Sequence, residues 1–199
     1  MKRFAIAPFL GAITVSAALV LTGCSSDDGG AQKDATSSQS DLRAPVVATF
    51  DDPSQPVTLA IGDNSAPTDP VATDADGVLL PPQDVSHLGW WADSALPGSN
   101  TGTIVVTGHV DDAAQGDGFA KKFSSLKAGD EVELSGKDGH TWTYRIDTVS
   151  SVSKNGGLPL DELNRLDGPE TLALITCGGK FIGPPLGYEN NDIAFASRI

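Results

Sequence analysis

The stretch from Thr171 to Gly179 constrains the fold of this chain more than any other. Its first half, residues 171–175, is a short apolar run of the kind that forms a buried β-strand. A single cysteine, Cys177, comes at the end of this run and is followed directly by two glycines. Glycine permits a sharp backbone turn and leaves space beside the sulfur. The stretch therefore predicts a strand that ends in a thiol, which is either a nucleophile or an ordinary buried residue.

Short apolar runs separated by turn residues continue through the chain from about residue 56. Strands are expected at 57–61, 103–107, 131–134, 141–146 with a continuation at 149–152, 171–175 and about 192–197, and short helices at 119–126 and near 160–166. The 22 glycines, 13 prolines and 20% charged residues suit a loop-rich β protein better than a helical bundle. Many short strands with little helix predict a closed β-barrel or a sandwich.

The N-terminus has the features of an export signal. Lys2 and Arg3 precede the apolar run 4–21, which ends in Leu-Thr-Gly-Cys24 and resembles a bacterial lipobox. We therefore expect residues 1–23 to be a lipoprotein signal peptide and Cys24 to be lipidated. This would anchor the exported protein to the outer face of the bacterial cell membrane. An uncleaved membrane-spanning helix is the alternative, because the apolar run is long enough for one.

The remaining chain divides into a tether and one domain. Residues 24–55 are largely polar and are expected to form a flexible tether, and residues 56–199 to form the folded domain. A lipidated Cys24 cannot form a disulfide, so Cys177 would be a free thiol and a candidate for reactivity. The net charge of -13 argues against nucleic acid or anionic lipid headgroups as binding partners.

Three histidines could activate the thiol. His109 follows the apolar run 103–107 and a glycine, so it is expected at a strand end, as Cys177 is. His140 lies in a predicted hairpin turn and is expected to be solvated. His87 precedes a pair of tryptophans and is expected to be a packing or loop residue. An imidazole within hydrogen-bonding reach is the usual partner of a reactive thiol. His109 is therefore the candidate base, although a strand end with Gly-His is also compatible with a structural histidine.

Together these residues resemble the sortases, and specifically the class E/F type of actinobacteria. The similar segments are Gly-Trp-Trp at 89–91 with Pro-Gly at 97–98, Thr-Gly-His-Val-Asp at 107–111, the stretch 119–132, and Leu-Ile-Thr-Cys-Gly-Gly at 174–179. The resemblance covers about residues 57 to 199. It implies a mainly β fold, a closed eight-stranded sortase-type barrel with one or two short helices, in which His109 and Cys177 lie at neighbouring strand ends.

The resemblance also implies a reaction. Cys177 would attack the carbonyl after the threonine of an LPXTG-like sorting signal and form a thioacyl enzyme. His109, as imidazolium, would protonate the departing amine. An acceptor amine, from a cell-wall precursor or a pilin lysine, would then release the product. No metal and no organic cofactor is expected, and the acidic residues near 111–117 are expected to form an exposed loop rather than a Ca²⁺ site.

One departure from the family pattern concerns an arginine that holds the oxyanion and the substrate backbone. Where such sortases carry Tyr-Arg-Asp-Asn, this chain has Tyr-Glu-Asn-Asn at 188–191, so Glu189 is expected in the arginine's place, facing the thiol. Loss of one oxyanion donor costs about 10²–10³ in rate. Arg198, further along the same strand, and Thr176 are the other candidates for an oxyanion or substrate contact.

Two alternatives remain at this point. An L,D-transpeptidase would also use a cysteine, but those enzymes place Ser-His-Gly before it, and Leu-Ile-Thr precedes Cys177 here. A sortase-fold module with weak or lost activity, which binds cell-wall or pilus peptides, is favoured by Glu189. The intact pair of Cys177 and His109 weighs against it.

Overall fold

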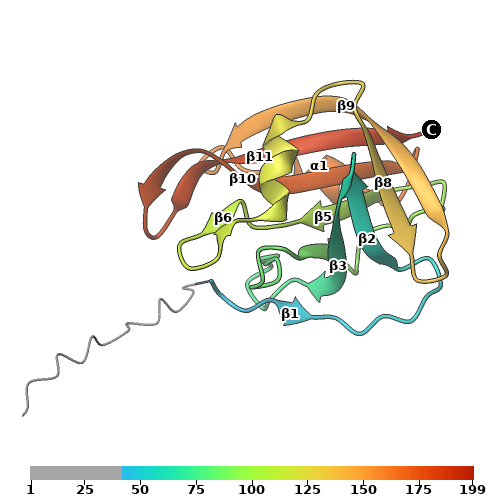
Figure 1. Cartoon of the computed structure of the whole chain (residues 1–199), viewed down its shortest axis with the longest axis horizontal. Helices are drawn as coiled ribbons and strands as arrows, with labels where there is room; N and C mark the ends of the chain where they lie inside the picture. Colours follow the sequence, from blue (N-terminus) through green and yellow to red (C-terminus); the bar gives the residue numbers. More distant parts are fainter. Residues whose placement is uncertain (1–41) are drawn as a thin grey trace, which may run out of the picture. The chain divides into compact units, whose positions relative to one another are not determined.

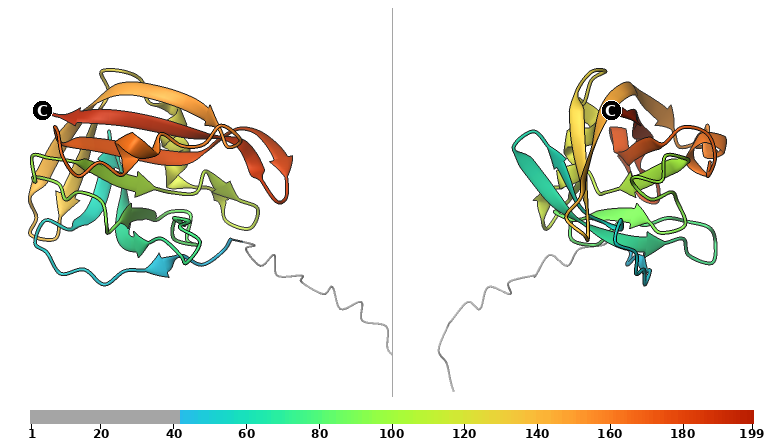
Figure 2. Two further views of the ribbon diagram at one scale, coloured as in Figure 1. Left: turned by 180° about the vertical axis from the view of Figure 1, so that it is seen from behind. Right: turned by 90° about the vertical axis from the view of Figure 1, so that its right-hand side faces the viewer.

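The computed structural model describes residues 42–199, and these residues form a β-barrel (Figures 1 and 2). The sheet strands are β1 (Val46–Val47), β2 (Pro56–Ile61), β3 (Asn64–Ala72), β4 (Leu88–Trp91), β5 (Thr103–Thr107), β8 (Glu131–Gly136), β9 (Thr141–Ser153), β10 (Thr171–Gly183) and β11 (Gly187–Arg198). Their order is β1-β3-β2-β8-β9-β11-β10-β5-β4, and a further pairing of β3 with β4 closes the ring. Eight strands form the closed barrel and β1 lies beside β3, so the predicted fold class is confirmed.

Three small elements complete the domain. The short strands β6 (Asp111–Asp112) and β7 (Gly116–Asp117) pair with each other after β5. The 3₁₀-helix η1 (Phe119–Ser125) follows them, and the single helical turn α1 (Leu160–Leu163) lies between β9 and β10. The helices expected at 119–126 and near 160–166 are thus present, the first as a 3₁₀-helix and the second as one turn.

The strand β10 is buried on both of its faces. Leu172 and Leu174 belong to the cluster that fills the barrel, whereas Ala173 and Ile175 belong to a second cluster. Side chains of a strand alternate between its two faces, so this second cluster lies on the outer face of the barrel. Burial on both faces explains why residues 171–175 form a continuous apolar run rather than an alternating one.

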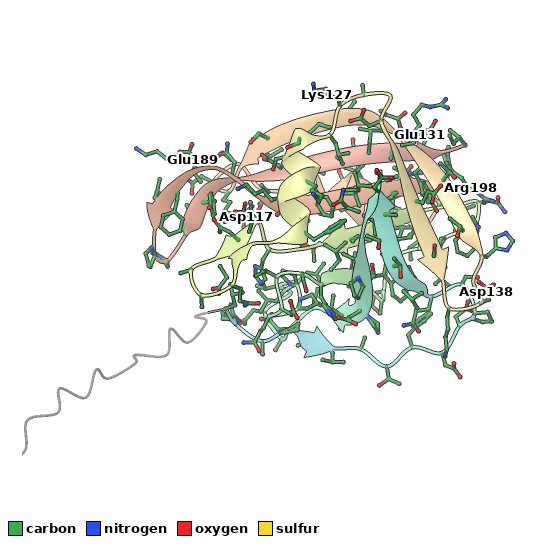
Figure 3. The ribbon with its side chains drawn as sticks, in the orientation of Figure 1. Asp117, Lys127, Glu131, Asp138, Glu189 and Arg198 are labelled. Atoms are coloured by element: carbon green, nitrogen blue, oxygen red, sulfur yellow. The ribbon has the colours of Figure 1, made fainter. Side chains whose placement is uncertain are left out.

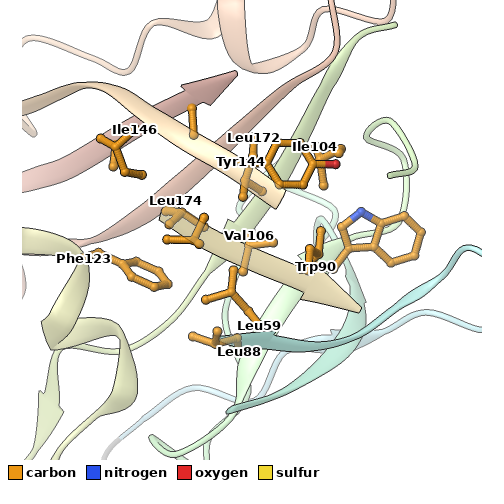
Figure 4. Packing of buried hydrophobic residues seen from close by; sticks show 14 of the residues in the cluster. Leu59, Leu88, Trp90, Ile104, Val106, Phe123, Tyr144, Ile146, Leu172 and Leu174 are labelled. Atoms are coloured by element: carbon orange, nitrogen blue, oxygen red, sulfur yellow. The ribbon is translucent and has the colours of Figure 1, made fainter. Parts of the chain in front are cut away.

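The barrel interior holds the main core, part of which is shown in Figure 4. Its largest fully buried side chains are Leu59, Leu88, Trp90, Ile104, Phe123, Leu134, Tyr144, Ile146, Leu172 and Leu174. Phe123 and Ala120 of η1 are buried in the same cluster, and η1 contacts β10 and β11. The short helix therefore covers the interior beside the strands that carry the predicted nucleophile.

The pairing of β5 with β10 is parallel and joins the two strands that lead to Cys177 and His109. Leu172 lies opposite Ile104, and the ladder ends with Ile175 opposite Thr107. Two residues beyond this last pair the chain reaches Cys177 on β10 and His109 after β5. The register therefore brings the two candidate residues to the same end of the barrel.

Two of the eight strands that close the barrel, β3 and β4, were not expected from the sequence. The segment that forms β3 contains Pro67 and Pro70, and proline removes a backbone donor and normally marks an edge strand or the end of one. The segment that forms β4 has only four residues, of which Leu88, Gly89 and Trp90 are buried. Such a short buried run gives no alternating pattern from which a strand could be recognised.

Part of the predicted tether belongs to the folded domain. Val46 and Val47 pair with Ala72 and Val71 of β3, and the ring of Phe50 packs edge-on against Trp90 with ring centroids 4.9 Å apart. These three apolar side chains distinguish this part of the tether from the polar residues before it. The contacts extend the folded part to the N-terminal side of the boundary expected at residue 56.

The remaining predictions for the N-terminus concern residues outside the described part of the chain. These are the signal peptide at 1–23, the lipidation of Cys24 and the tether before residue 42. Within residues 42–199, no helix has the length and apolar character needed to cross a membrane.

A buried carboxylate holds together the end of the barrel where β11 finishes. The side chain of Glu170 is only 3% exposed and accepts hydrogen bonds from Tyr144 Oη at 2.6 Å and from the backbone N–H groups of Gly98 and Asn100 at 3.1 and 2.6 Å. Arg198 Nη1 lies 3.4 Å from the same carboxylate. Burial, followed by this hydrogen bond, strongly raises the pKa of Tyr144, which keeps the phenol protonated as the donor.

Glu170→Ala should therefore be strongly destabilising. It leaves the Tyr144 hydroxyl and two backbone N–H groups without their acceptor and removes the only carboxylate paired with Arg198 among residues 42–199, so we expect a loss of about 3–5 kcal/mol in the free energy of unfolding. Urea denaturation measures this loss. Glu133→Ala, at an exposed position of β8, is the control and should change stability by less than about 0.5 kcal/mol. Equal effects of the two substitutions would contradict the role of Glu170.

Candidate active site

Cys177 lies on the outer face of the barrel, in β10. It is two residues beyond Ile175 of the outer cluster and therefore shares the face of that side chain. It is partly buried and is the free cysteine of the described residues. Its partner on β11 is Asn191, and the register shifts directly after the next pair, Gly178 with Asn190.

A side chain at position 178 would collide with its neighbour. A Cβ built on Gly178 would lie 2.2 Å from the carboxylate atoms of Asp192, which itself accepts a hydrogen bond from Ser151 Oγ at 2.6 Å. The first glycine after the cysteine is thus required by close packing between β10 and β11. This requirement explains part of the Cys-Gly-Gly sequence.

His109 reaches the same face from the neighbouring strand. Thr107 and His109 alternate with Val106 and Gly108, and Val106 belongs to the interior cluster. A Cβ on Gly108 would lie 2.6 Å from Ala120 Cβ and from a methyl carbon of Leu88, which shows that position 108 faces the interior. His109 therefore points to the outer side, as Cys177 does.

The two residues line one cavity of about 500 Å³. Its wall is mainly apolar and comes from the segment between β3 and β4, from β5 and β10, and from the segment that contains α1. The apolar residues of the wall include Leu79, Leu80, Trp91, Val105, Leu158, Leu163 and Ile175. Cys177, His109, Lys154, Thr176 and Asn191 are among the polar residues that line it. A mainly apolar cavity that contains a thiol suits an extended peptide with an apolar side chain.

Hydrogen bonds fix the segment that carries His109. Thr176 Oγ1 donates to the carbonyl oxygen of Gly108 at 2.9 Å, and the N–H of Gly108 donates to the carbonyl oxygen of Ile175 at 3.2 Å. Beyond the histidine, the hydroxyl of Tyr188 donates to the carboxylate of Asp111. The hydrogen bond to Asp111, ahead of burial, raises the pKa of Tyr188 to about 12. The Thr176 hydroxyl, a candidate for substrate contact, therefore donates to the backbone that positions His109.

The environment of His109 favours its neutral form. Burial lowers the pKa of His109, and the nearby carboxylates of Asp112 and Asp111 oppose this effect only in part. Its Nε2 atom is buried and has no hydrogen-bond partner among residues 42–199. A neutral imidazole with an unused nitrogen can accept a proton, which is what a general base next to a thiol must do.

Lys154 is a residue of the site that the sequence did not indicate. Its Nζ lies 3.5 Å from Cys177 Sγ and donates a hydrogen bond to the carbonyl oxygen of Leu186 at 3.0 Å. Its backbone N–H donates to the carbonyl oxygen of Glu189 at 3.0 Å. The only signal in the sequence is a lysine directly after the strand that pairs with β11, and its meaning depends on a register that the sequence does not reveal.

Neither Glu189, expected in the arginine's place, nor Arg198, a candidate for oxyanion contact, lines the cavity. Glu189 is exposed, and its Oε1 accepts a hydrogen bond from the N–H of Lys180 at 3.1 Å. Arg198 lies opposite Tyr144 and pairs with Glu170. Figure 3 shows Glu189 and Arg198 near opposite ends of β11. The structure thus places Asn191, and neither Glu189 nor Arg198, beside Cys177.

The remaining histidines lie elsewhere. His87 Nδ1 is 2.8 Å from Asp69 Oδ2, and His140 is exposed in the turn between β8 and β9, where it contacts Trp142. Among the described residues there is no group of three or more His, Cys, Asp or Glu side chains that could hold a metal ion.

A comparison with protein families agrees with this geometry. The Sortase domain model matches residues 60–199. This chain belongs to the sortase family. Sortases are cysteine transpeptidases that bind sorting-signal peptides and amine acceptors. A search of curated proteins gives no match.

Solved sortases share the fold at low sequence identity. Sortase C-1 from Actinomyces oris is 21% identical with a TM-score of 0.55, and the match covers 74% of this chain and 75% of the other. Sortase C1 from Streptococcus agalactiae is 18% identical over 76% and 70% of the chains, with a TM-score of 0.56. Sortase A from Corynebacterium diphtheriae is 22% identical over 79% and 62%, with a TM-score of 0.53. These similarities establish the barrel fold.

Asp112→Asn should lower the pKa of His109 further. The substitution removes the larger of the two carboxylate effects that oppose burial. NMR titration of the imidazole resonances measures the change, with His87 and His140 as internal references. An unchanged titration of His109 would show that the Asp112 carboxylate does not act on the imidazole.

The same shift makes stability depend on pH. Because the pKa of His109 is lowered on folding, the unfolded chain binds this proton more strongly, and folding loses stability as the pH falls below the ordinary value of 6.5. In Asp112→Asn the loss should continue to lower pH. Urea denaturation across this range, compared with His109→Gln, isolates the contribution of the imidazole.

Proposed function

We propose that this sortase cleaves an LPXTG-like sorting signal through a thioacyl intermediate on Cys177 and transfers the acyl group to an amine at the cell surface. The observation that carries the proposal is the convergence of Cys177 and His109, from adjacent parallel strands, on one apolar cavity. The motifs at 107–111 and 174–179 support assignment to class E/F.

The chemistry proceeds in two steps. His109 Nε2 takes the thiol proton, and Cys177 Sγ forms a bond to the peptide carbonyl carbon while the carbonyl electrons move to oxygen. The tetrahedral intermediate then collapses as the C–N bond breaks, and the proton on His109 passes to the departing amine. An acceptor amine, such as one of a cell-wall precursor or a pilin lysine, attacks the thioester and restores the thiol.

The apolar wall gives a basis for selecting a sorting signal. The side chains of Leu79, Leu80 and Leu163 line the cavity on the same outer face as Ile175 and Cys177. Burial of a leucine side chain contributes about 1.5–3 kcal/mol, which suits a leucine ahead of the cleaved bond. The reaction needs no metal or organic cofactor, because thiol and imidazole supply the nucleophile and the proton transfer.

Incubation with a library of LPXTG-type peptides tests the proposal by intact mass. The wild-type protein should gain the mass of an acyl fragment, and Cys177→Ala should gain none while its melting temperature changes little, because the side chain is partly exposed. Addition of an amine should then remove the adduct and yield the transpeptidation product. Failure of every peptide to form an adduct on wild-type protein would contradict the proposed reaction.

A second function, peptide binding without turnover, has one specific observation in its favour. No arginine lines the cavity within the described residues, and Arg198 is paired with Glu170. A binding module would retain peptide, measured by calorimetry, without forming a thioacyl adduct. The two outcomes separate the functions in one set of samples.

We further propose that the protein is held at the outer face of the cell membrane by lipid on Cys24. The Leu-Thr-Gly-Cys sequence and the apolar run before it support this proposal. Two acyl chains are enough for stable anchoring, whereas one chain gives only reversible binding. Cys24→Ser should abolish fatty-acid labelling and release the domain from the membrane fraction. Unchanged labelling in this variant would overturn the lipid assignment.

A further inference from the structure

The cavity contains a cation that is in contact with the nucleophile. Lys154 Nζ lies 3.5 Å from Cys177 Sγ and donates a second hydrogen bond to the carbonyl oxygen of Leu186. A carbonyl oxygen orients the ammonium group without neutralising its charge. No carboxylate is paired with Lys154 among the salt bridges of the described residues. The charge of Lys154 is thus directed at the thiol.

Two features of the backbone hold Lys154 in this place. It follows the end of β9, where Ser153 pairs with Asn190 and Val152 pairs with Asn191, the residue opposite Cys177. Its own N–H then donates to the carbonyl oxygen of Glu189 at 3.0 Å. The lysine is therefore fixed to the strand next to the one that carries the thiol, rather than to a separate loop. It is also partly buried, which reduces the screening of its charge by water.

We propose that Lys154 is a catalytic residue whose ammonium group stabilises the Cys177 thiolate and then the oxyanion of the acylation step. The inference rests on the proposed transpeptidase function. When His109 takes the thiol proton, negative charge develops on the sulfur, and a cation in contact with it lowers the free energy of that state. Lys154 keeps its protons throughout and forms no bond to the substrate.

From the same position the ammonium group of Lys154 also stabilises the second charged state, which is the oxyanion of the tetrahedral intermediate. In the tetrahedral intermediate the negative oxygen is bonded to the carbon that carries Sγ, so it lies two bonds from the sulfur atom that Lys154 already contacts. A donor placed beforehand at a developing oxyanion is usually the largest electrostatic contribution to acyl transfer. Asn191, opposite Cys177 on β11, is the neighbouring polar side chain, and it carries no charge. Among residues 42–199, Lys154 is the one lysine or arginine that lines the cavity.

Three variants of the full chain test the inference. Lys154→Met keeps an unbranched side chain one atom shorter and removes its charge, whereas Lys154→Arg keeps the charge. Lys180→Met is the matched control, because Lys180 is exposed on β10, the strand that carries Cys177, and does not line the cavity. Melting temperatures establish that each variant is folded before the reactivity measurements.

The first measurement is the rate of alkylation of Cys177 by iodoacetamide, a neutral reagent, as a function of pH. Lys154→Met should move the profile to higher pH, because the thiolate has lost its cation. Lys154→Arg should restore it, and Lys180→Met should match wild type. A lysine that only supports the fold would change the rate equally at all pH values. Superimposable profiles of wild type and Lys154→Met would overturn the inference.

The second measurement is single-turnover acylation by a reactive peptide, followed by intact mass. Lys154→Met should acylate about 10²–10³ times more slowly, as expected for loss of one oxyanion donor, and Lys154→Arg should recover part of the rate. Acylation of Lys154→Met at the wild-type rate would overturn the oxyanion role. If no peptide acylates the wild type while the alkylation profile still shifts, the transpeptidase proposal fails and the action of Lys154 on the thiolate is supported.

Discussion

The parallel pairing of β5 with β10 is the constraint on which the site depends. Neither strand carries both functional residues, and they come from segments more than sixty residues apart in the sequence. The ladder from Thr103–Thr171 to Thr107–Ile175 fixes how far along the barrel Cys177 and His109 lie, each two residues beyond the last pair. Because side chains alternate, the same ladder also fixes the face on which Cys177 and His109 emerge. A shift of one residue in this register would turn one of them toward the interior.

The apolar cluster on the outer face of the barrel both packs on these strands and forms part of the wall of the cavity. Val105, Leu163, Ala173, Ile175 and Ile193 pack on the outside of the barrel, and the chain that contains α1 covers them. This packing buries the end of β10 on both faces, so the strand cannot rotate to expose Cys177 without losing apolar contacts. It also supplies the wall of the cavity that leads to the thiol. Stability of β10 and the shape of the cavity therefore depend on the same side chains.

The sequence predicted the residues whose position depends on local pattern. Cys177 and His109 each follow an apolar run that forms a strand, so their position just beyond the buried part of a strand follows from the run alone. The strand end expected at Cys177 is wrong, because β10 continues past the thiol to Gly183, whereas β5 ends two residues before His109. Lys154 has no such pattern, because its contact with Cys177 exists only through the pairing of β9 with β11 and of β11 with β10. The contact between Lys154 and Cys177 therefore depends on the arrangement of three strands, β9, β11 and β10.

The position of Glu189 is a second feature that depends on strand pairing and could not be predicted from the sequence alone. Alignment of a short motif placed it opposite the thiol, but the strand pairs Cys177 with Asn191 and then shifts register after Gly178. β10 advances three residues between Gly178 and Phe181 while β11 advances two, and spacing along one strand cannot reveal such a bulge because it is defined by the pairing of two strands. The apolar residues near the start of the domain were missed for a related reason. Val46, Val47 and Phe50 are too few to form a pattern, and their pairing partners lie in a strand interrupted by prolines.

The charges around Cys177 suggest why a lysine and a neutral histidine occur together. Burial lowers the pKa of His109, so the imidazole is poised to take a proton rather than to act as a permanent cation. A thiolate formed by that transfer needs a positive charge, and at the start of the reaction the imidazole does not supply one. Lys154 Nζ, 3.5 Å from the sulfur, is in place before the transfer occurs. In the proposed mechanism the two tasks are separate: His109 carries the proton from the thiol to the leaving amine, and Lys154 provides the fixed charge. Once His109 is protonated, its charge and that of Lys154 repel each other, which favours release of the proton to the amine.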